Sequence, residues 1–264
     1  MKKRPQSNET GSTAEAEPAP DDAVPKIRRQ KRGQSKKARK ENALTEWLKS
    51  LGVAVLLFVV MRTFVLQTFV ITSGSMENTL LVGDMLVANQ AAIGARIPGT
   101  SWRTPGYSRP RRGEVWVFDP RHEVDMKLVK RLIGVPDDTL EMRGGTLFLN
   151  GEEQVEPYLN PIRGQDERSP DFEWQRDYLV EGVDRASYQP SRHHWGPIAI
   201  PEGYYFMLGD NRDSSYDSRY WGLLESWRLE GRVAFTYFSY NANSYRPFPV
   251  LREIRWDRVG RGID

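Results

Sequence analysis

The stretch TLEMRGGTLFLNG, residues 139–151, decides the fold class. Two short runs of strand-forming residues flank the triplet RGG, and the second run ends in NG. Gly-Gly and Asn-Gly pairs favour the tight turns that connect the two strands of a β-hairpin. We therefore expect consecutive strands at this point, and a chain whose folded part is mainly β.

The same pattern continues on both sides of this stretch. Runs of β-branched and aromatic residues bounded by Gly, Pro, Asn or Asp predict strands. Three further runs of this kind are EVWVFD at 114–119, YYFML at 204–208 and RVAFTYF at 232–238. Residues 156–200 are instead polar and Pro-rich, with many Arg and Asp, which indicates an insertion or cap with irregular loops.

The basic charge of the chain lies at its N-terminal end. Residues 1–49 hold 13 Lys and Arg against 7 Asp and Glu, a net charge of +6, whereas the whole chain has +3. A nucleic-acid-binding body would carry the basic excess itself, so we expect no nucleic acid as a partner. The leading residues lack any apolar periodicity, and residues 26–40 contain nine cations and no acid. This composition predicts a disordered basic cytoplasmic tail over residues 1–43.

One strongly apolar run follows the tail. Residues 50–61, SLGVAVLLFVVM, carry no charge, and with their apolar flanks they are long enough to cross a hydrocarbon core of ~30 Å. We expect a transmembrane helix over residues 44–65, with the basic side in the cytoplasm. A buried core helix and the centre of a cleavable signal peptide are the competing interpretations. A polar leader of 49 residues is too long for a signal peptide. Nine unopposed cations before the run argue against a buried core helix.

The absence of cysteine and the small number of histidines exclude several kinds of chemistry. The chain has no Cys and only three His, so it has neither a disulfide nor a cysteine nucleophile. His122 stands alone in a polar stretch, and the adjacent His193 and His194 point apart on a strand or a helix. We expect surface histidines, no Ser-His-Asp triad and no metal site.

Serine is the remaining nucleophile, and SGSMENTLLVGDMLVAN at residues 73–89 offers two serines around one glycine. Gly74 allows a tight turn from which Ser73 and Ser75 project to related positions. One hydroxyl can then attack a carbonyl while the other donates to the developing oxyanion. A turn that only caps a strand is the competing interpretation.

A serine needs a base, and MKLVKRLIGVPDD at residues 126–138 offers a lysine. Strand alternation places Leu128, Lys130 and Leu132 on one face, so the amine is surrounded by apolar side chains. Loss of hydration disfavours the ammonium form and lowers its pKa. A shift to about 8 corresponds to roughly 3 kcal/mol. The competing interpretation is a solvated strand lysine.

A third segment, MLGDNRDSSYDSRYWG at residues 207–222, places Asp and Arg residues among serines. A calcium loop would need the glycine and terminal glutamate of an EF-hand, which are missing. The alternation of Asp with Arg indicates ion pairs within the protein instead.

Together, these three segments resemble the conserved motifs of bacterial type I signal peptidases, the membrane-bound serine/lysine leader peptidases. The order S-G-S-M…T-L, G-D, K-R…G-x-P…D and G-D-N-R-D-x-S-x-D-S-R-x-W-G is the family's, and the last motif matches over residues 209–222. The resemblance runs from about residue 44 to about residue 240. It implies an extracytoplasmic catalytic core of antiparallel sheets over residues 66–145 and 203–264, with an inserted β cap over 146–202.

The resemblance also implies roles for individual residues. Ser75 would be the nucleophile and Lys130 the general base, with the Ser73 hydroxyl and the Ser75 N–H as oxyanion donors. Ser215 would hydrogen-bond the Lys130 amine and orient it. Two further sets are a supporting ion pair and a group of apolar residues that line shallow pockets for small side chains: Asp217 and Arg219 for the pair, and Phe69, Ile71, Leu80 and Val129 for the pockets.

The function implied is that of a plasma-membrane endopeptidase, without a cofactor, that removes N-terminal signal peptides after Ala-x-Ala-like sites. Its partners would be exported precursor proteins, the lipid bilayer and, as a candidate, the secretion translocon. The family often has Pro where Thr72 and Asn78 stand and Gly where Asp137 stands, but none of these is a proposed chemical group. A Ser/Lys protease of another family, acting on a repressor-like substrate, and a non-catalytic β binding module remain as alternatives.

Overall fold

The computed structural model describes residues 30–97, 100, 102–121 and 126–263, with side chains from residue 43 onward. Its first element is the helix α1, Gln30–Phe64. The expectation of an irregular backbone up to residue 43 is wrong for residues 30–43, because Lys, Arg, Gln and Glu are good helix formers even without an apolar face. Residues 1–29 of the expected tail, and His122, lie outside the described residues.

The second half of α1 has the composition of a membrane span. Ala43–Phe64 is 22 residues long with a mean hydropathy of 1.8, and a helix of this length covers about 33 Å. Its large apolar side chains are exposed, Leu56 to 62% and Phe58 to 68%. By length and composition, this is the one helix in the described part of the chain that could cross a bilayer.

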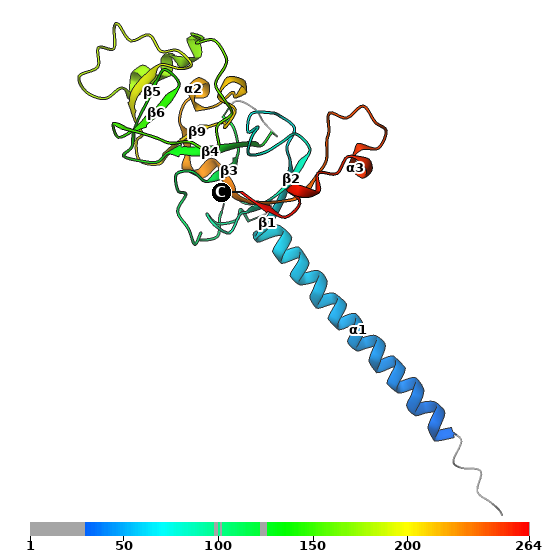
Figure 1. Ribbon diagram of the computed structural model, residues 1–264. Helices are drawn as coiled ribbons and strands as arrows, with labels where there is room; N and C mark the ends of the chain where they lie inside the picture. The colour runs from blue at the N-terminus through cyan, green and yellow to red at the C-terminus, as the bar shows by residue number, and fades with distance from the viewer. Residues whose placement is uncertain (1–29, 98–99, 101, 122–125, 264) are drawn as a thin grey trace, which may run out of the picture. The chain divides into compact units, whose positions relative to one another are not determined.

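Most of the strands form one antiparallel sheet, whose order is β1-β2-β11-β3-β4-β9-β10, with β12 paired to β11 (Figure 1). Its strands are β1 Leu66–Val70, β2 Asp84–Asn89, β3 Val115–Phe118, β4 Leu128–Gly134, β9 Tyr204–Leu208, β10 Leu224–Glu225, β11 Leu229–Ser239 and β12 Arg261–Gly262. The strands expected over residues 114–119, 204–208 and 232–238 are confirmed. β4 lies inside the sheet between β3 and β9, and its residues from Lys130 to Gly134 are buried.

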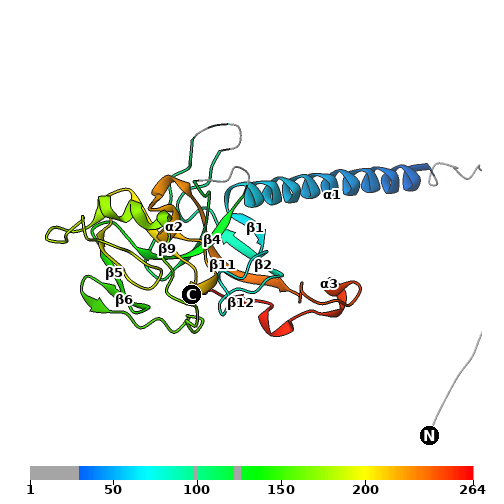
Figure 2. The same ribbon diagram turned by 90° about the horizontal axis from the view of Figure 1, so that it is seen from above.

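A second antiparallel sheet has the order β7-β6-β5-β8. Its strands are β5 Thr139–Arg143, β6 Thr146–Leu149, β7 Glu152–Glu153 and β8 Trp195–Ala199. The stretch at residues 139–151 forms the two expected turns, one at Gly144 and Gly145 and one at Asn150 and Gly151, all with positive φ. Figures 1 and 2 show the β5–β6 hairpin at the opposite end of the β body from β1 and β2. The mainly antiparallel β fold is confirmed.

The expected boundary of the cap differs from the structure. A boundary between residues 145 and 146 cuts the β5–β6 hairpin at its turn, because β5 pairs with both β6 and β8. The second sheet therefore begins at Thr139. No local signal marks this position, because β4 and β5 are consecutive strands separated by only a short turn.

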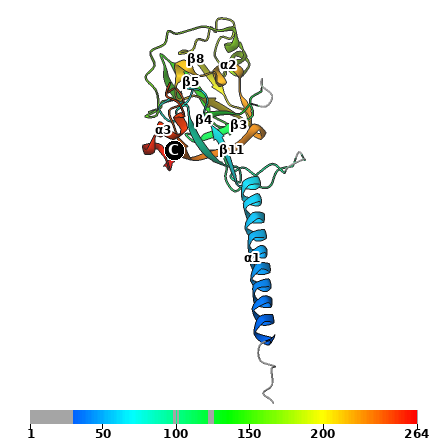
Figure 3. The same cartoon turned by 90° about the vertical axis from the view of Figure 1, so that its right-hand side faces the viewer.

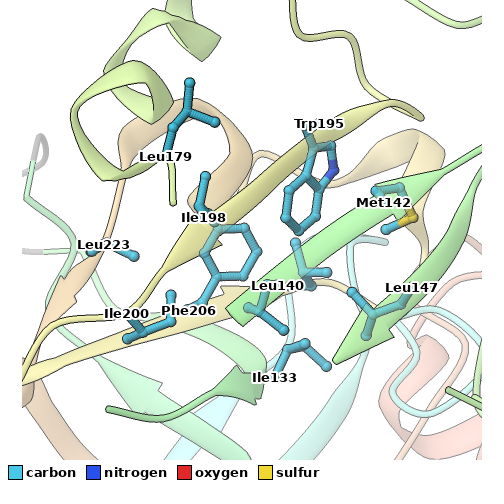
Figure 4. Close-up of a cluster of buried hydrophobic side chains, with 11 residues drawn as sticks. Ile133, Leu140, Met142, Leu147, Leu179, Trp195, Ile198, Ile200, Phe206 and Leu223 are labelled. Carbon is cyan, nitrogen blue, oxygen red and sulfur yellow. The ribbon is translucent and has the colours of Figure 1, made fainter. Parts of the chain in front are cut away.

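The two sheets share a hydrophobic cluster. Figure 4 shows Ile133 and Phe206 of the main sheet beside Leu140, Leu147 and Trp195 of the second sheet. Side chains from both sheets are fully buried there, and each large one contributes roughly 1.5–3 kcal/mol. The main sheet and the second sheet are therefore packed against each other as one β body.

The rest of the described chain is short helices and loops. The longest is the 3-10 helix η1, Pro170–Tyr178, whose first turn is capped by the Ser169 hydroxyl. Residues 154–169 and 179–194 are otherwise irregular, as the Pro-rich composition predicted. Figure 3 shows α2 and β8 at the same end of the β body. The other short helices are η2 Arg212–Ser214, α2 Ser218–Trp221, η3 Ser226–Arg228, α3 Pro249–Arg252 and η4 Trp256–Arg258.

Candidate active site

The fold brings together the three segments that the sequence singled out. The first is the loop after β1, the second is β4, and the third follows β9. Asn211 joins the segment after β9 to the loop after β1. Its N–H donates to Ser75 O at 3.1 Å, and its Nδ2 donates to Gly74 O at 3.2 Å. Fifty-five residues separate the first two segments at their point of contact, so only the tertiary fold can place them side by side.

The centre of the site is a serine hydroxyl beside a lysine amine. Lys130 Nζ forms a hydrogen bond of 2.6 Å with Ser75 Oγ. Both residues are buried, Ser75 to 7% exposure and Lys130 to 3%. This distance is within the reach that a general base needs to remove a proton from its nucleophile.

The surroundings of Lys130 favour its neutral form. Burial lowers the pKa of the amine from 10.5 to about 8, with help from Arg219, although Asp217 and Asp210 attract the ammonium and oppose the shift. The alternation expected for β4 explains the burial, since Leu132 and Leu128 pack in one cluster with Trp116, whose Cα lies opposite Lys130 in the neighbouring strand. The interpretation of Lys130 as a solvated strand lysine is therefore wrong.

Ser73 lies on the open side of the same site. Its Oγ is 3.4 Å from Ser75 Oγ, and the residue is exposed. A carbonyl that approaches Ser75 from solvent would therefore meet both hydroxyls. Gly74 makes no unusual turn between them: its φ is outside the left-handed region, and an added Cβ would meet only Glu77 Oε2, at 3.6 Å.

Ser215 lies close to the site without the expected contact. Its Oγ is buried, and among the described residues no hydrogen bond joins it to Lys130, so the predicted contact is absent. Ser215 Oγ lies next to Gly209 instead. A Cβ built on Gly209 would lie 2.2 Å from Ser215 Oγ and 2.4 Å from Ser75 O, which places the Ser215 hydroxyl in the crowded space behind the nucleophile.

The expected ion pair is present and fully buried. Arg219 Nε and Nη2 donate to the two carboxylate oxygens of Asp217 at 2.8 and 2.9 Å. Burial alone would raise the pKa of Asp217, but the Arg219 guanidinium outweighs it and holds that pKa below its usual range. The Asp217 carboxylate also accepts the Gly209 N–H at 3.2 Å. This pair therefore fixes the turn that carries Ser215.

A second buried pair was not assigned from the sequence. Arg131 donates to both carboxylate oxygens of Asp210, at 2.9 and 2.8 Å, with side chains 2% and 1% exposed. Thr79 Oγ1 donates to the same carboxylate at 2.5 Å. This network ties β4, next to the lysine, to the loop that carries the serine. The interleaved Asp and Arg residues indicated internal pairs, but the partner of Asp210 lies 79 residues away and has no local signal.

The four residues expected to line substrate pockets belong to one cluster. Ile71 and Leu80 are buried in it, and Phe69 and Val129 are partly buried against it. Met76, directly after the nucleophile, is in the same cluster. An apolar surface therefore extends from β1 and β4 to the serine loop.

The histidines differ in part from the expectation. His194 is exposed, but His193 is buried to 8% exposure, with Nε2 at 3.4 Å from Asp213 Oδ1. The expected surface position of His193 is wrong, because the carboxylates of Asp166 and Asp213 lie on either side of its ring. Within the described ranges, no group of three His, Asp or Glu side chains is placed to hold a metal ion.

Comparison with known proteins places this geometry in a family. The family described as signal peptidase, peptidase S26, matches residues 44–238. The chain belongs to the signal peptidase family. It is 32% identical over 210 residues to the signal peptidase I of Bacillus licheniformis, covering 79% of this chain and 96% of that protein. It is 36% identical over 190 residues to the signal peptidase I of Pseudomonas aeruginosa, covering 70% and 66% of the two proteins, and 34% identical over 239 residues to that of Pseudomonas fluorescens, covering 85% and 81%.

Membership of the signal peptidase family makes this chain a peptidase, and it decides against a serine/lysine protease of another family. The match begins inside α1 and ends inside β11. It therefore includes nearly all of the apolar span, the second sheet, the main sheet apart from β12 and the end of β11, and all three segments of the site. What the site can do chemically follows from its contents: a hydroxyl nucleophile, an amine of lowered pKa in contact with it, and a second hydroxyl on the open side.

Proposed function

We propose that this chain removes N-terminal signal peptides from exported precursor proteins, through an acyl-enzyme on Ser75 with neutral Lys130 as the general base. The observation that carries the proposal is the 2.6 Å contact between Ser75 Oγ and an amine that burial desolvates. A hydroxyl with an unperturbed proton is a weak nucleophile, and an adjacent base within hydrogen-bond reach is what activates it.

In the first half of the reaction, Lys130 Nζ takes the proton of Ser75 as Oγ attacks the scissile carbonyl. The oxyanion receives hydrogen bonds from the Ser73 hydroxyl and the Ser75 N–H, each worth about 3 kcal/mol in the transition state. Lys130 then gives its proton to the leaving amine, and the peptide bond breaks. The mature protein leaves with a free N-terminus, and the signal peptide remains as an ester on Ser75.

In the second half, Lys130 is neutral again and activates a water molecule. The water attacks the ester carbonyl, the same two donors hold the oxyanion, and Lys130 returns its proton to Ser75 Oγ. The protonated lysine of each half-reaction is a buried cation, and the carboxylates of Asp217 and Asp210 attract it. These two carboxylates are therefore proposed to lower the free energy of the protonated lysine, and Arg219 is proposed to fix the position of Asp217.

The specificity is proposed to come from the apolar cluster beside the serine. A precursor segment would bind as an extended strand along residues 69–73, with its side chains toward Phe69, Ile71, Leu80 and Val129. Because Ile71 and Leu80 are already buried, they leave only shallow depressions. Small side chains such as those of an Ala-x-Ala site fit such depressions, whereas larger ones do not.

The location is proposed to be the plasma membrane, with one pass. Ala43–Phe64 supplies the span, and the basic residues that precede it place the N-terminus in the cytoplasm. The catalytic β body then lies on the extracytoplasmic side, where signal peptides emerge. Tethering enzyme and precursor in one bilayer raises their effective concentration. The secretion translocon is a candidate neighbour at this surface.

The experiment that tests the proposal uses the full chain in detergent or liposomes and a precursor with an Ala-x-Ala site. Ser75→Ala and Lys130→Ala should each abolish cleavage while the tryptophan fluorescence of the folded protein stays that of wild type. Ser75 should also react with a fluorophosphonate probe, and Lys130→Ala should suppress that labelling. Near-normal turnover by Lys130→Ala would overturn the mechanism. Absence of both cleavage and labelling in the wild-type protein would instead favour a non-catalytic binding module.

A further inference from the structure

One short segment of the insertion contacts all three catalytic segments. Residues 156–160, between β7 and η1, are here called the strap. Asn78 Nδ2, from the serine loop, donates to the carbonyls of Tyr158 and Leu159 at 2.9 and 3.2 Å. The Arg131 guanidinium, from β4, lies 3.8 Å from the centre of the Tyr158 ring. The strap thus touches the loop that carries the nucleophile and the strand that carries the base.

The strap is also bound to the segment after β9. The N–H of Asn160 donates to Asp210 O at 3.1 Å. Arg212 Nη2 donates to Glu156 Oε1 at 2.5 Å, and their side chains are 1% and 4% exposed. The Tyr158 hydroxyl donates to the same Glu156 oxygen at 2.8 Å. Separating two charges that are this deeply buried would leave each of them unpaired, which strongly destabilises a protein. The pair therefore holds this end of the strap in place.

Asn78 is suited to its place in the serine loop. Its φ is +88°, a region that Asn enters more readily than other residues with a side chain. It stands three positions after Ser75, whose carbonyl accepts a hydrogen bond from the Asn211 N–H. The strap and the segment after β9 therefore both hold the serine loop.

We propose that the strap is a positioning device for the nucleophile, and that Asn78 and Glu156 are its positioning residues. Neither touches the reacting atoms; Asn78 fixes the loop of Ser75 against the strap, and Glu156 fixes the strap against Arg212. This inference rests on the proposed function. A displacement of about 1 Å from the productive geometry is enough to lower a rate by about 100-fold, so the contacts of the strap are within range of a large effect on turnover.

The first test is Asn78→Gly in the full chain. Glycine keeps the positive φ without strain and removes only the two hydrogen bonds to the strap. The matched control is Asn150→Gly, another Asn at positive φ, in the β6–β7 turn. We expect Asn78→Gly to lower kcat about 10- to 100-fold with KM within twofold of wild type, and to slow fluorophosphonate labelling of Ser75 in proportion. The melting temperature should fall no further than in the control, which should keep wild-type activity.

The second test is a double-mutant cycle with Glu156→Gln, which preserves shape and removes the charge facing Arg212. Glu156→Gln alone should lower kcat at least fivefold. Because both residues act through one strap, the double variant should be less than threefold slower than Asn78→Gly alone.

Three results would overturn the inference. The first is a wild-type kcat in Asn78→Gly, and the second is a loss of kcat that follows the fall in melting temperature in all variants. The third is a double variant whose loss of kcat is the full product of the two single losses. The proposed function fails separately. It fails if Ser75→Ala still cleaves the precursor, whatever the strap variants do.

Discussion

The proposed base of this site is a lysine whose charged form is destabilised by burial. Lys130 is 3% exposed, and its pKa is lowered to about 8 mainly by burial. A lysine in water is almost entirely charged near neutral pH, and only the neutral amine can accept the proton of Ser75. Under the proposed mechanism, the packing around this one residue sets the pH range in which the peptidase can work.

The first prediction is the pH dependence of cleavage. Because the neutral amine is the active form, kcat/KM should fall as pH drops through the pKa of Lys130 and level off above it. With a pKa of about 8, about half the sites are active at pH ~8 and about a tenth at pH ~7. The measurement is kcat/KM on an Ala-x-Ala precursor from about pH 6 to about pH 11, which spans both pKa values. A midpoint at the ordinary lysine value of 10.5 would contradict a desolvated amine.

The second prediction concerns stability. The unfolded chain binds a proton at Lys130 up to pH ~10.5, whereas the folded chain releases it at about 8. Burial of the ammonium therefore destabilises the folded state by up to about 3 kcal/mol below pH ~8, and this cost disappears between the two pKa values. Lys130→Met, of similar length, should raise the free energy of unfolding at pH 7 by about 2–3 kcal/mol and abolish activity.

The measurement is denaturant unfolding of wild type and Lys130→Met at pH 7 and at pH 10.5, followed by tryptophan fluorescence. The advantage of the variant should be large at the lower pH and close to zero at the higher one. If the difference in stability between variant and wild type is the same at both pH values, the lysine is hydrated in the folded protein.

At the scale of elements, the site depends on how closely the segment after β9 approaches the serine loop. Gly209 lies between them, and a Cβ there would be 2.2 Å from Ser215 Oγ and 2.4 Å from Ser75 O. Neither neighbour can move easily, since one belongs to the nucleophile's own backbone and the other to the turn that Asp217 and Arg219 fix. A methyl group at this position has to push the two segments apart.

The third prediction compares two glycines. Gly209→Ala should lower the free energy of unfolding by about 1–3 kcal/mol, as overpacking of a dense interior does, and should reduce kcat at least 100-fold. Gly74→Ala meets only Glu77 Oε2, at 3.6 Å, and should change stability by less than about 0.5 kcal/mol. Thermal unfolding of the two variants measures the difference. Similar losses in both would show that the loop of Ser75 is more crowded than its contacts indicate.

The elements differ in how far the sequence could predict them. β9 was predicted with the bounds that the structure has. Strand alternation around Lys130 indicated a buried amine, but a solvated strand lysine remained as the competing interpretation. The pair Arg131–Asp210 and the strap could not be found in this way, because their partners are 79 and about 56 residues apart. The orientation of Ser215 was also beyond reach, since it depends on space left by Gly209 in the folded protein. Local pattern predicts elements, whereas long-range polar contacts depend on how the sheets are joined.

At the scale of the molecule, the chain combines an apolar helix with a β body whose two sheets share one core. The N-terminal charge and the apolar span were visible in the sequence, but the length of the helix was not, because the basic residues before the span are also good helix formers. The cap boundary was misplaced because nothing in the residues of β5 shows that this strand pairs with β6 and β8 and not with the main sheet. Which sheet a strand joins is decided by long-range pairing, and local composition does not report it.

The last prediction tests the membrane span with two arginines. Ala54→Arg places a charge near the middle of Ala43–Phe64, where it costs about 3 kcal/mol to insert. Ala43→Arg places the same charge at the end of the span, where a long side chain reaches the headgroups. Alkaline carbonate should therefore extract much more of the Ala54→Arg protein than of the Ala43→Arg protein or wild type. Protease added to intact spheroplasts should digest the β body and spare the N-terminal tail until the cells are lysed. Equal extraction of both variants would exclude this span, and digestion of the tail before the body would reverse the proposed orientation.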